Sequence, residues 1–123
     1  MKDWVATVVI AAVLSLVGMP ALAQTRAAAA ADTTGKAIFL GKGNCHVCHG
    51  KDAKGTPLAP DLTDAELLNI DGKLESISKL VKAGVPAPKK HPAPMPPMGG
   101  MTLSDAEVQA VAAYVFSLRA PPK

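Results

Sequence analysis

The chain has 123 residues, enough for one small domain, and its 13 Lys and Arg against 10 Asp and Glu give a formal net charge of +3. This mildly basic balance, with no stretch that interleaves basic and aromatic residues, argues against nucleic-acid binding. Aromatic residues make up only 3% of the chain. A domain with so few large side chains is expected to need a cofactor, a metal or disulfides to complete its core.

The N-terminal stretch has the layout of a secretory signal peptide. Lys2 supplies a charged start, a charge-free apolar run follows, and Ala21-Leu22-Ala23 offers small residues at a cleavage site. We therefore expect residues 1–23 to be a cleaved signal, 24–31 a flexible leader and 32–120 the folded domain, located in the periplasm. The alternative is an uncleaved membrane anchor facing the periplasm, because the charge-free run is nearly long enough to span a bilayer.

The next two segments with helical signals flank the cysteines. Asp32-Thr33-Thr34 offers capping side chains for a first helix, whose apolar side is Ala37 to Leu40 and which Gly41-Lys42-Gly43 should end. Residues 72–81 carry apolar side chains at helical spacing, and Gly84 follows as a stop signal. Both segments are predicted to be helices.

The rest of the chain divides into a loop and a final helix. Val85 to Met101 holds six prolines and a Gly-Gly pair, so regular structure is excluded there. Ser104-Asp105-Ala106-Glu107 is a capping-box sequence, and the apolar positions from Val108 to Leu118 follow at helical spacing. No alternating strand pattern appears, so the predicted fold class is all-α.

The segment Cys45-His46-Val47-Cys48-His49 is the C-x-x-C-H signature of covalent c-type haem attachment. On a helical turn, residues three apart share a face, so both sulfurs can reach one porphyrin edge while His49 coordinates the iron. A thiol–disulfide redox site, half of a zinc site and a structural disulfide are the alternatives. The first lacks a βαβ context, the second lacks two further ligands, and the third could not replace a missing core.

From Gly35 to Leu118 the chain resembles a small bacterial monohaem class I c-type cytochrome. In that family a glycine and an aromatic residue of the first helix pack on an apolar residue and an aromatic residue of the last; Gly35, Phe39, Val111 and Tyr114 match them. The resemblance implies a small cytochrome c fold. Three to five helices would wrap one haem c, bound covalently through Cys45 and Cys48.

The resemblance also implies contacts around the haem. In the family the carbonyl of a proline after the motif accepts the ring proton of the ligating histidine, and Pro60 follows His49 at a similar distance. Leu62 would then lie against the haem. The alternative is that Pro60 only interrupts regular structure in the loop. His46 is expected to face solvent.

Three methionines in the proline-rich loop are candidates for the sixth iron ligand. The family uses a methionine just before the last helix, commonly in Met-Pro followed by Gly-Gly, and Met95 stands in that place. Methionine is a soft ligand that raises the reduction potential of a histidine-ligated haem. Met98, Met101 and His91 are the alternatives, and His91 would give bis-histidine ligation.

With His49 and Met95 both on iron, no position is left for a substrate. The sequence therefore predicts an electron carrier or electron-transfer subunit, not an enzyme, which moves single electrons between redox proteins such as an oxidase, a reductase or a dehydrogenase. A peroxidase-like enzyme or a gas sensor would need an open or labile sixth position. We expect a monomer.

Six lysines come from segments that flank the expected haem. They are consistent with an ordinary solvated surface, and the functional alternative is a positive ring that steers acidic partners. These lysines are Lys42, Lys51, Lys54, Lys82, Lys89 and Lys90.

Overall fold

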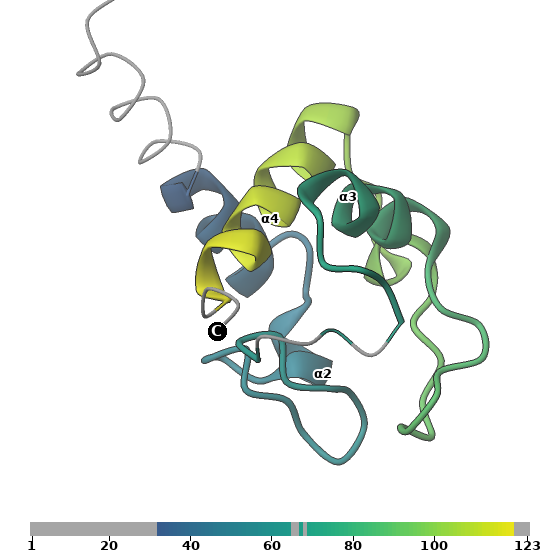
Figure 1. Ribbon diagram of the computed structural model, residues 1–123. Helices are drawn as coiled ribbons and strands as arrows, with labels where there is room; N and C mark the ends of the chain where they lie inside the picture. The colour runs from purple at the N-terminus through teal and green to yellow at the C-terminus, as the bar shows by residue number, and fades with distance from the viewer. Residues whose placement is uncertain (1–31, 65–66, 68, 120–123) are drawn as a thin grey trace, which may run out of the picture.

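The computed structural model describes residues 32–64, 67 and 69–119, and the predicted signal peptide and leader lie outside this part (Figure 1). Residues 32–40 are helical, followed by α2 (His46–His49), α3 (Leu74–Ala83), the 3₁₀ turn η1 (Pro97–Gly100) and α4 (Asp105–Leu118). The described residues form no strand, so the predicted all-α class is confirmed. None of their helices is both long and apolar enough to cross a membrane.

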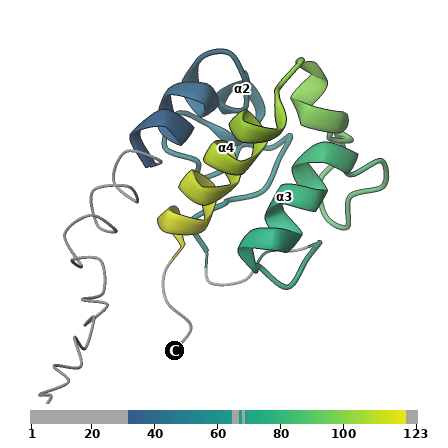
Figure 2. The ribbon, with the colours of Figure 1, turned by 90° about the horizontal axis from the view of Figure 1, so that it is seen from above.

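The helix of residues 32–40 lies across α4, as two views at right angles show (Figures 1 and 2). A Cβ atom on Gly35 would overlap the Ala110 carbonyl oxygen and would lie 2.6 Å from Cβ of Tyr114. Only glycine permits this approach. Next to it, the rings of Phe39 and Tyr114 meet edge to face, with centroids 5.5 Å apart. The predicted packing of the first helix on the last is therefore confirmed.

Asp32, Thr33 and Thr34 do not occupy the positions that the sequence predicted for them. Asp32, Thr33 and Thr34 are themselves helical and do not precede the helix as caps. The Asp32 carboxylate instead accepts a hydrogen bond of 2.6 Å from the Ser117 hydroxyl, near the end of α4. The side chain that looked like a local cap thus links the first helix to the last.

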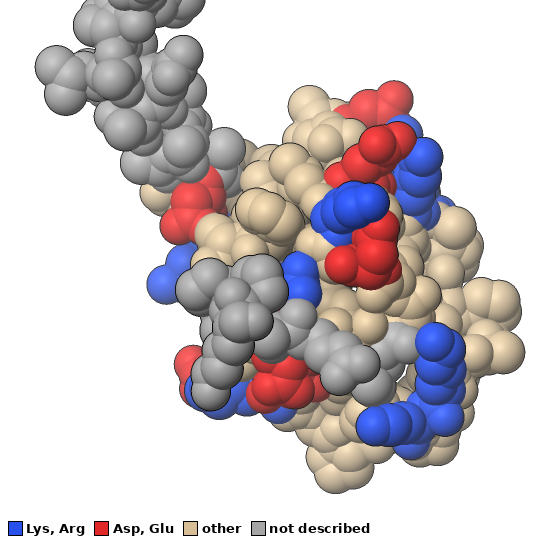
Figure 3. Space-filling view, viewed as in Figure 1, with Lys and Arg blue, Asp and Glu red and all other residues tan. Residues whose placement is uncertain are grey.

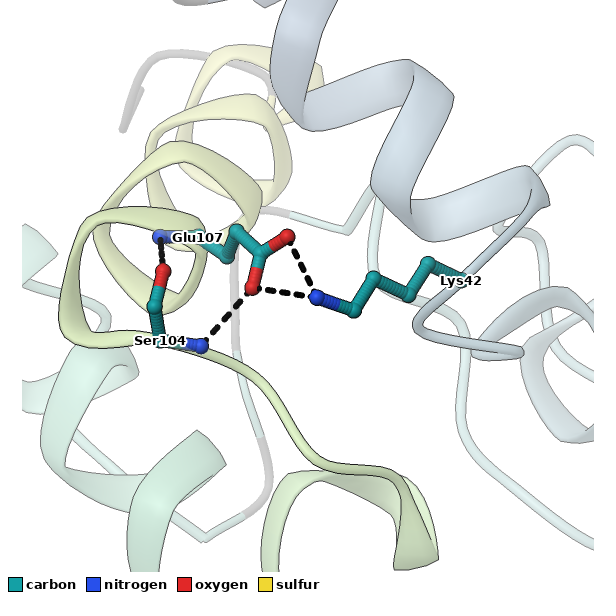
Figure 4. Close-up of polar contacts among 3 residues, drawn as sticks. All are labelled: Lys42, Ser104 and Glu107. Carbon is teal, nitrogen blue, oxygen red and sulfur yellow. Dashed lines mark hydrogen bonds and ion pairs between the residues drawn. The ribbon is translucent and has the colours of Figure 1, made fainter.

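The N-terminus of α4 is closed by the predicted capping box, which a lysine extends (Figure 4). The Ser104 hydroxyl accepts from the Glu107 N–H at 3.2 Å, and the Glu107 carboxylate accepts from the Ser104 N–H at 2.8 Å. Lys42 Nζ donates to both carboxylate oxygens of Glu107, at 2.7 and 2.8 Å. The segment that leads into α2 is thereby tied to the start of α4.

Helix α3 packs against α4 and η1, beginning two residues later than predicted and ending two residues later. Its N-cap, Lys73, makes no side-chain capping bond, so no capping residue marked the start of this helix in the sequence. Buried Ser78 bonds to the Leu74 carbonyl at 3.1 Å and to the Gln109 side chain at 3.2 Å. Because the hydroxyl has both partners, α3 can bury it against α4.

A compact group of side chains fills the space between these helices. Phe39, Val108 and Val111 are its largest fully buried members. Nearby, the guanidinium of Arg119 donates to the Gly72 carbonyl at 2.6 Å and to the Asp64 carbonyl at 3.4 Å. These two bonds connect the residue after α4 to the segment before α3.

Candidate functional site

Helix α2 is a single turn that carries the C-x-x-C-H segment. Cys45 is its N-cap, with helical φ and ψ of −62° and −33°, and the His49 N–H donates to the Cys45 carbonyl at 3.0 Å. Gly50, with φ of 80°, ends the turn in a conformation that glycine adopts freely. Both thiols are free, and they lie one turn apart on the helix, as the motif predicts.

The His49 ring is buried, with 9% of its surface exposed, and its Nδ1 lies 3.0 Å from the Pro60 carbonyl oxygen. A carbonyl only accepts, so Nδ1 carries the proton of this bond and Nε2 keeps a lone pair. Burial lowers the pKa of His49, and the Pro60 carbonyl opposes that effect more weakly. A neutral imidazole held in this tautomer is the form that binds a metal.

The loop after α2 is fastened to the turn by short hydrogen bonds. The Gly55 N–H donates to the His49 carbonyl at 2.8 Å, and the Thr56 hydroxyl donates to the Cys48 carbonyl at 2.6 Å. Sequence reasoning missed the contribution of Thr56. A single threonine in a Gly/Pro-rich loop carries no pattern that would have revealed it.

All six residues predicted for the site line one cavity. The cavity has a volume of about 220 Å³ and is open to solvent on one side. The predicted residues are Cys45, Cys48, His49, Pro60, Leu62 and Met95. Burial raises the pKa of the Cys45 thiol, which keeps that sulfur neutral in the folded chain.

The remaining walls are mostly apolar side chains from the helices. Phe39 contributes from the first helix, Ile77 and Val81 from α3, and Val111 and Val115 from α4. Asn69 is one of the few polar side chains among the walls. Two thiols, a buried imidazole and a thioether around such a cavity fit a large apolar group that carries a metal.

The three loop methionines are placed differently. Met95 lines the cavity, whereas Met98 packs against the buried core and Met101 is 39% exposed. Met98 follows Pro97 with φ of 53°, so the chain turns sharply between it and Met95. His91 also lines the cavity, and its Nδ1 lies 3.5 Å from the Pro57 carbonyl.

The loop between α3 and η1 is more ordered than predicted. Val85 and Met95 form an isolated antiparallel bridge, with N–H···O distances of 2.8 and 3.0 Å. No sequence pattern predicted this bridge, because it uses only backbone atoms of two residues within a proline-rich stretch.

His46 also differs from the prediction. Its ring is half-buried, and Nδ1 lies 3.3 Å from the Phe39 carbonyl. It therefore does not simply face solvent, because its ring connects α2 to the first helix.

The six lysines are not equivalent. Lys42 is paired with Glu107, and Lys82 with Asp105 at 2.6 Å. Basic side chains gather at the lower right of Figure 3, over the loop between α3 and η1 that holds Lys89 and Lys90. Around the rim of the cavity, Leu58 presents 48% of its surface to solvent. Val47, on α2, is 57% exposed.

Comparison with known proteins gives a match to the cytochrome c family model over residues 33–119. The chain is 35% identical over 79 residues to the cbb3-type cytochrome c oxidase subunit CcoP of Rubrivivax gelatinosus, covering 64% of this chain and 24% of that protein. It is 34% identical over 84 residues to the cbb3-type cytochrome c oxidase subunit FixP of Rhizobium etli, covering 66% of this chain and 29% of that protein. The chain thus matches about a quarter of the length of these curated relatives. No solved structure gives a significant match.

Proposed function

Because the chain belongs to the cytochrome c family, we propose that it is an exported electron carrier or electron-transfer subunit whose haem iron is ligated by His49 and Met95. The family binds haem c, and Cys45 and Cys48 hold it covalently. The observation that carries the proposal is the placement of the His49 ring and the Met95 side chain on one apolar cavity that also takes in both thiols.

The haem, when bound, supplies an iron that takes up and releases single electrons. The protein's part is to hold and tune that iron. Pro60 fixes the His49 ring, so that the Nε2 lone pair is available and the ring is a better donor. Met95 offers a soft thioether, which favours the reduced iron and raises the potential. With both positions filled, no substrate reaches the metal.

Spectroelectrochemical titration of the purified holoprotein tests the ligation. We expect Met95→Ala to abolish the sulfur-to-Fe(III) charge-transfer band and to lower the potential. Met98→Ala and Met101→Ala are matched controls and should leave both nearly unchanged. Loss of the band in Met98→Ala alone would move the ligand by three residues. An unchanged band in all three, with loss of iron ligation in His91→Ala, would favour bis-histidine ligation.

A peroxidase-like enzyme is the competing function, because His91 lines the cavity and could act as an acid or base. It would need an open iron position. Peroxide turnover by freshly reduced, undamaged wild-type protein decides between them. We expect negligible turnover, and a substantial rate would reject the electron carrier.

The partner is proposed to be a redox protein with an acidic docking surface. Both relatives are named as oxidase subunits, which favours an oxidase over a reductase or a dehydrogenase as the redox partner. Lys89 and Lys90 are the exposed charges proposed to steer it. Lys42 and Lys82 are left out of this surface because carboxylates already pair with them.

Stopped-flow mixing with a reduced acidic partner tests this surface. The rate should fall as salt rises, because charges are screened over about 8 Å at physiological ionic strength. Reversing Lys89 and Lys90 to Glu should lower the rate and leave the potential nearly unchanged. Lys36→Glu with Lys79→Glu gives the same change in net charge on helices outside the loop, and should have a smaller effect. Equal effects of the two double variants would reject docking through the loop.

Export to the periplasm is proposed from residues 1–23. Mass spectrometry of the native protein should find Gln24 at the N-terminus, in a soluble periplasmic fraction. An intact Met1 in a membrane fraction would favour the anchor. Sedimentation of the purified holoprotein checks the proposed monomer.

A further inference from the structure

The end of α3 holds the backbone of Met95. The Val85 N–H donates to the Met95 carbonyl at 2.8 Å, and the Met95 N–H donates back to the Val85 carbonyl at 3.0 Å. Both residues line the cavity. Because this pair joins the two ends of the loop, the place of Met95 depends on where α3 ends and much less on the tip of the loop.

Gly84 makes this pairing possible. It caps α3 with φ of 73°, and its N–H donates to the Leu80 carbonyl at 2.7 Å. A Cβ atom on Gly84 would overlap the Met95 carbonyl oxygen and would lie 2.8 Å from the carbonyl carbon of Pro96. These are backbone atoms, so no change of rotamer can relieve the overlap. The consecutive prolines at 96 and 97 further restrict how that backbone can move.

We propose that Gly84 is a positioning residue, whose missing side chain lets α3 hold Met95 at the cavity wall with its thioether in place for the iron. The inference rests on the proposed ligation by Met95. A glycine outside the haem motif thus controls how firmly the sixth ligand is bound. The occupied fraction of that ligand in turn sets the potential and the access of other ligands to the iron.

Gly84→Ala tests the inference, with Gly100→Ala as its matched control. Gly100 has a similar φ of 81°, but the nearest atom to a Cβ there is Pro96 Cγ at 3.6 Å. The two variants therefore share the strain of a left-handed alanine, and only Gly84→Ala overlaps the Met95 backbone.

We expect Gly84→Ala to weaken the sulfur-to-Fe(III) charge-transfer band and lower the potential. The variant should also bind added imidazole roughly tenfold more tightly than wild type, because Met95 occupies the iron for a smaller fraction of the time. Gly100→Ala should stay near wild type in all three measurements. Equal changes in both variants would mean that backbone strain alone is responsible, and would overturn the proposal.

Met95→Ala in the same series separates two kinds of failure. If Met95→Ala keeps the band, the proposed ligation itself is wrong. If Met95→Ala loses the band while Gly84→Ala keeps it with an unchanged potential, only the role of Gly84 is wrong.

Amide hydrogen exchange on the wild-type holoprotein gives an answer even if Gly84→Ala does not fold. The amides of Val85 and Met95 should exchange more slowly than those of Lys89 and Lys90 at the loop tip, because only the first pair is bonded across the loop. Equal exchange rates would show that the end of α3 does not hold Met95, and would overturn the proposal.

Discussion

His49 donates through Nδ1 to the carbonyl oxygen of Pro60 across 3.0 Å, and Gly55 packs against the same Pro60 backbone. Gly55 in turn donates its N–H to the His49 carbonyl at 2.8 Å. The ring and main chain of the histidine are therefore both fixed by one loop. This arrangement favours the tautomer with the proton on Nδ1 before any metal binds to the ring.

Gly55→Ala should disturb that arrangement. Gly55 has φ of 83°, and a Cβ there would lie 2.8 Å from the carbonyl carbon of Pro60 and 2.6 Å from the Asp61 nitrogen. We expect the Pro60 carbonyl to move away from His49. NMR should then show faster solvent exchange of the Nδ1 proton, and the potential should rise because a less basic imidazole stabilises oxidised iron less.

Pro60→Ala is the control for this prediction, because it keeps the carbonyl while it removes the ring of the proline. Its Nδ1 exchange rate should lie nearer to that of wild type. A Gly55→Ala protein with an unchanged exchange rate would show that the loop does not hold the hydrogen bond.

Gly35→Ala should destabilise the crossing of the first helix and α4. The added methyl group would meet the Ala110 carbonyl and the Tyr114 side chain, and such overpacking costs about 1–3 kcal/mol. Denaturant unfolding of the holoprotein measures the change. The neighbouring exposed substitution Lys36→Ala should stay within about 0.5 kcal/mol of wild type. A Gly35→Ala protein at least as stable as wild type would contradict the close packing.

Glu107→Gln should reduce stability at neutral pH and have less effect in acid. The Lys42 ion pair and the Ser104 N–H hold the pKa of Glu107 below its usual value near 4.5. A carboxylate with a lowered folded-state pKa stabilises the fold above its usual pKa, and that contribution is lost as pH falls through the folded-state pKa. Thermal unfolding should show the gap between variant and wild type closing below about pH 4.5.

Asp52→Asn, which removes an exposed carboxylate from the loop after α2, is the control for that pH dependence. A Glu107→Gln protein whose deficit stays constant into acid would argue against the ion pair.

Removal of both haem attachment points should leave the chain unable to fold cooperatively. The cavity is walled by apolar side chains from three helices, and without haem their burial cannot offset the lost chain entropy. We expect Cys45→Ala with Cys48→Ala to give no sharp thermal transition by circular dichroism. Each single variant should retain haem on the chain through acid–acetone treatment. A sharp transition in the double variant would show that the helices fold cooperatively without covalently attached haem.

The local signals in the sequence were reliable where one segment supplies its own chemistry. The turn of Cys45 to His49 and the capping box from Ser104 to Glu107 are both present, because each needs only side chains three or four residues apart. The contact between Gly35 and α4 was predicted through the family resemblance. Neither composition nor helical spacing could have supplied it.

The features that were missed join distant parts of the chain. Asp32 bonds to Ser117, and His46 contacts the Phe39 carbonyl, although each side chain had a plausible local interpretation. Met95 and Met98 have similar local sequence surroundings, because both are methionines in the same proline-rich stretch. Their placement differs because of a turn at Met98 and a backbone pair at Met95, neither of which leaves a periodic pattern.

The backbone pair between Val85 and Met95 has a consequence for how this chain could vary. Since the two ends of the loop are already joined, extra residues inserted between the exposed Lys89 and Lys90 should leave the Val85–Met95 pair in place. The entropic cost of closing a loop rises by only about 0.6 kcal/mol for each doubling of its length. A recognition peptide or a label inserted there should change which partners bind to this loop, while the reduction potential of the iron stays the same.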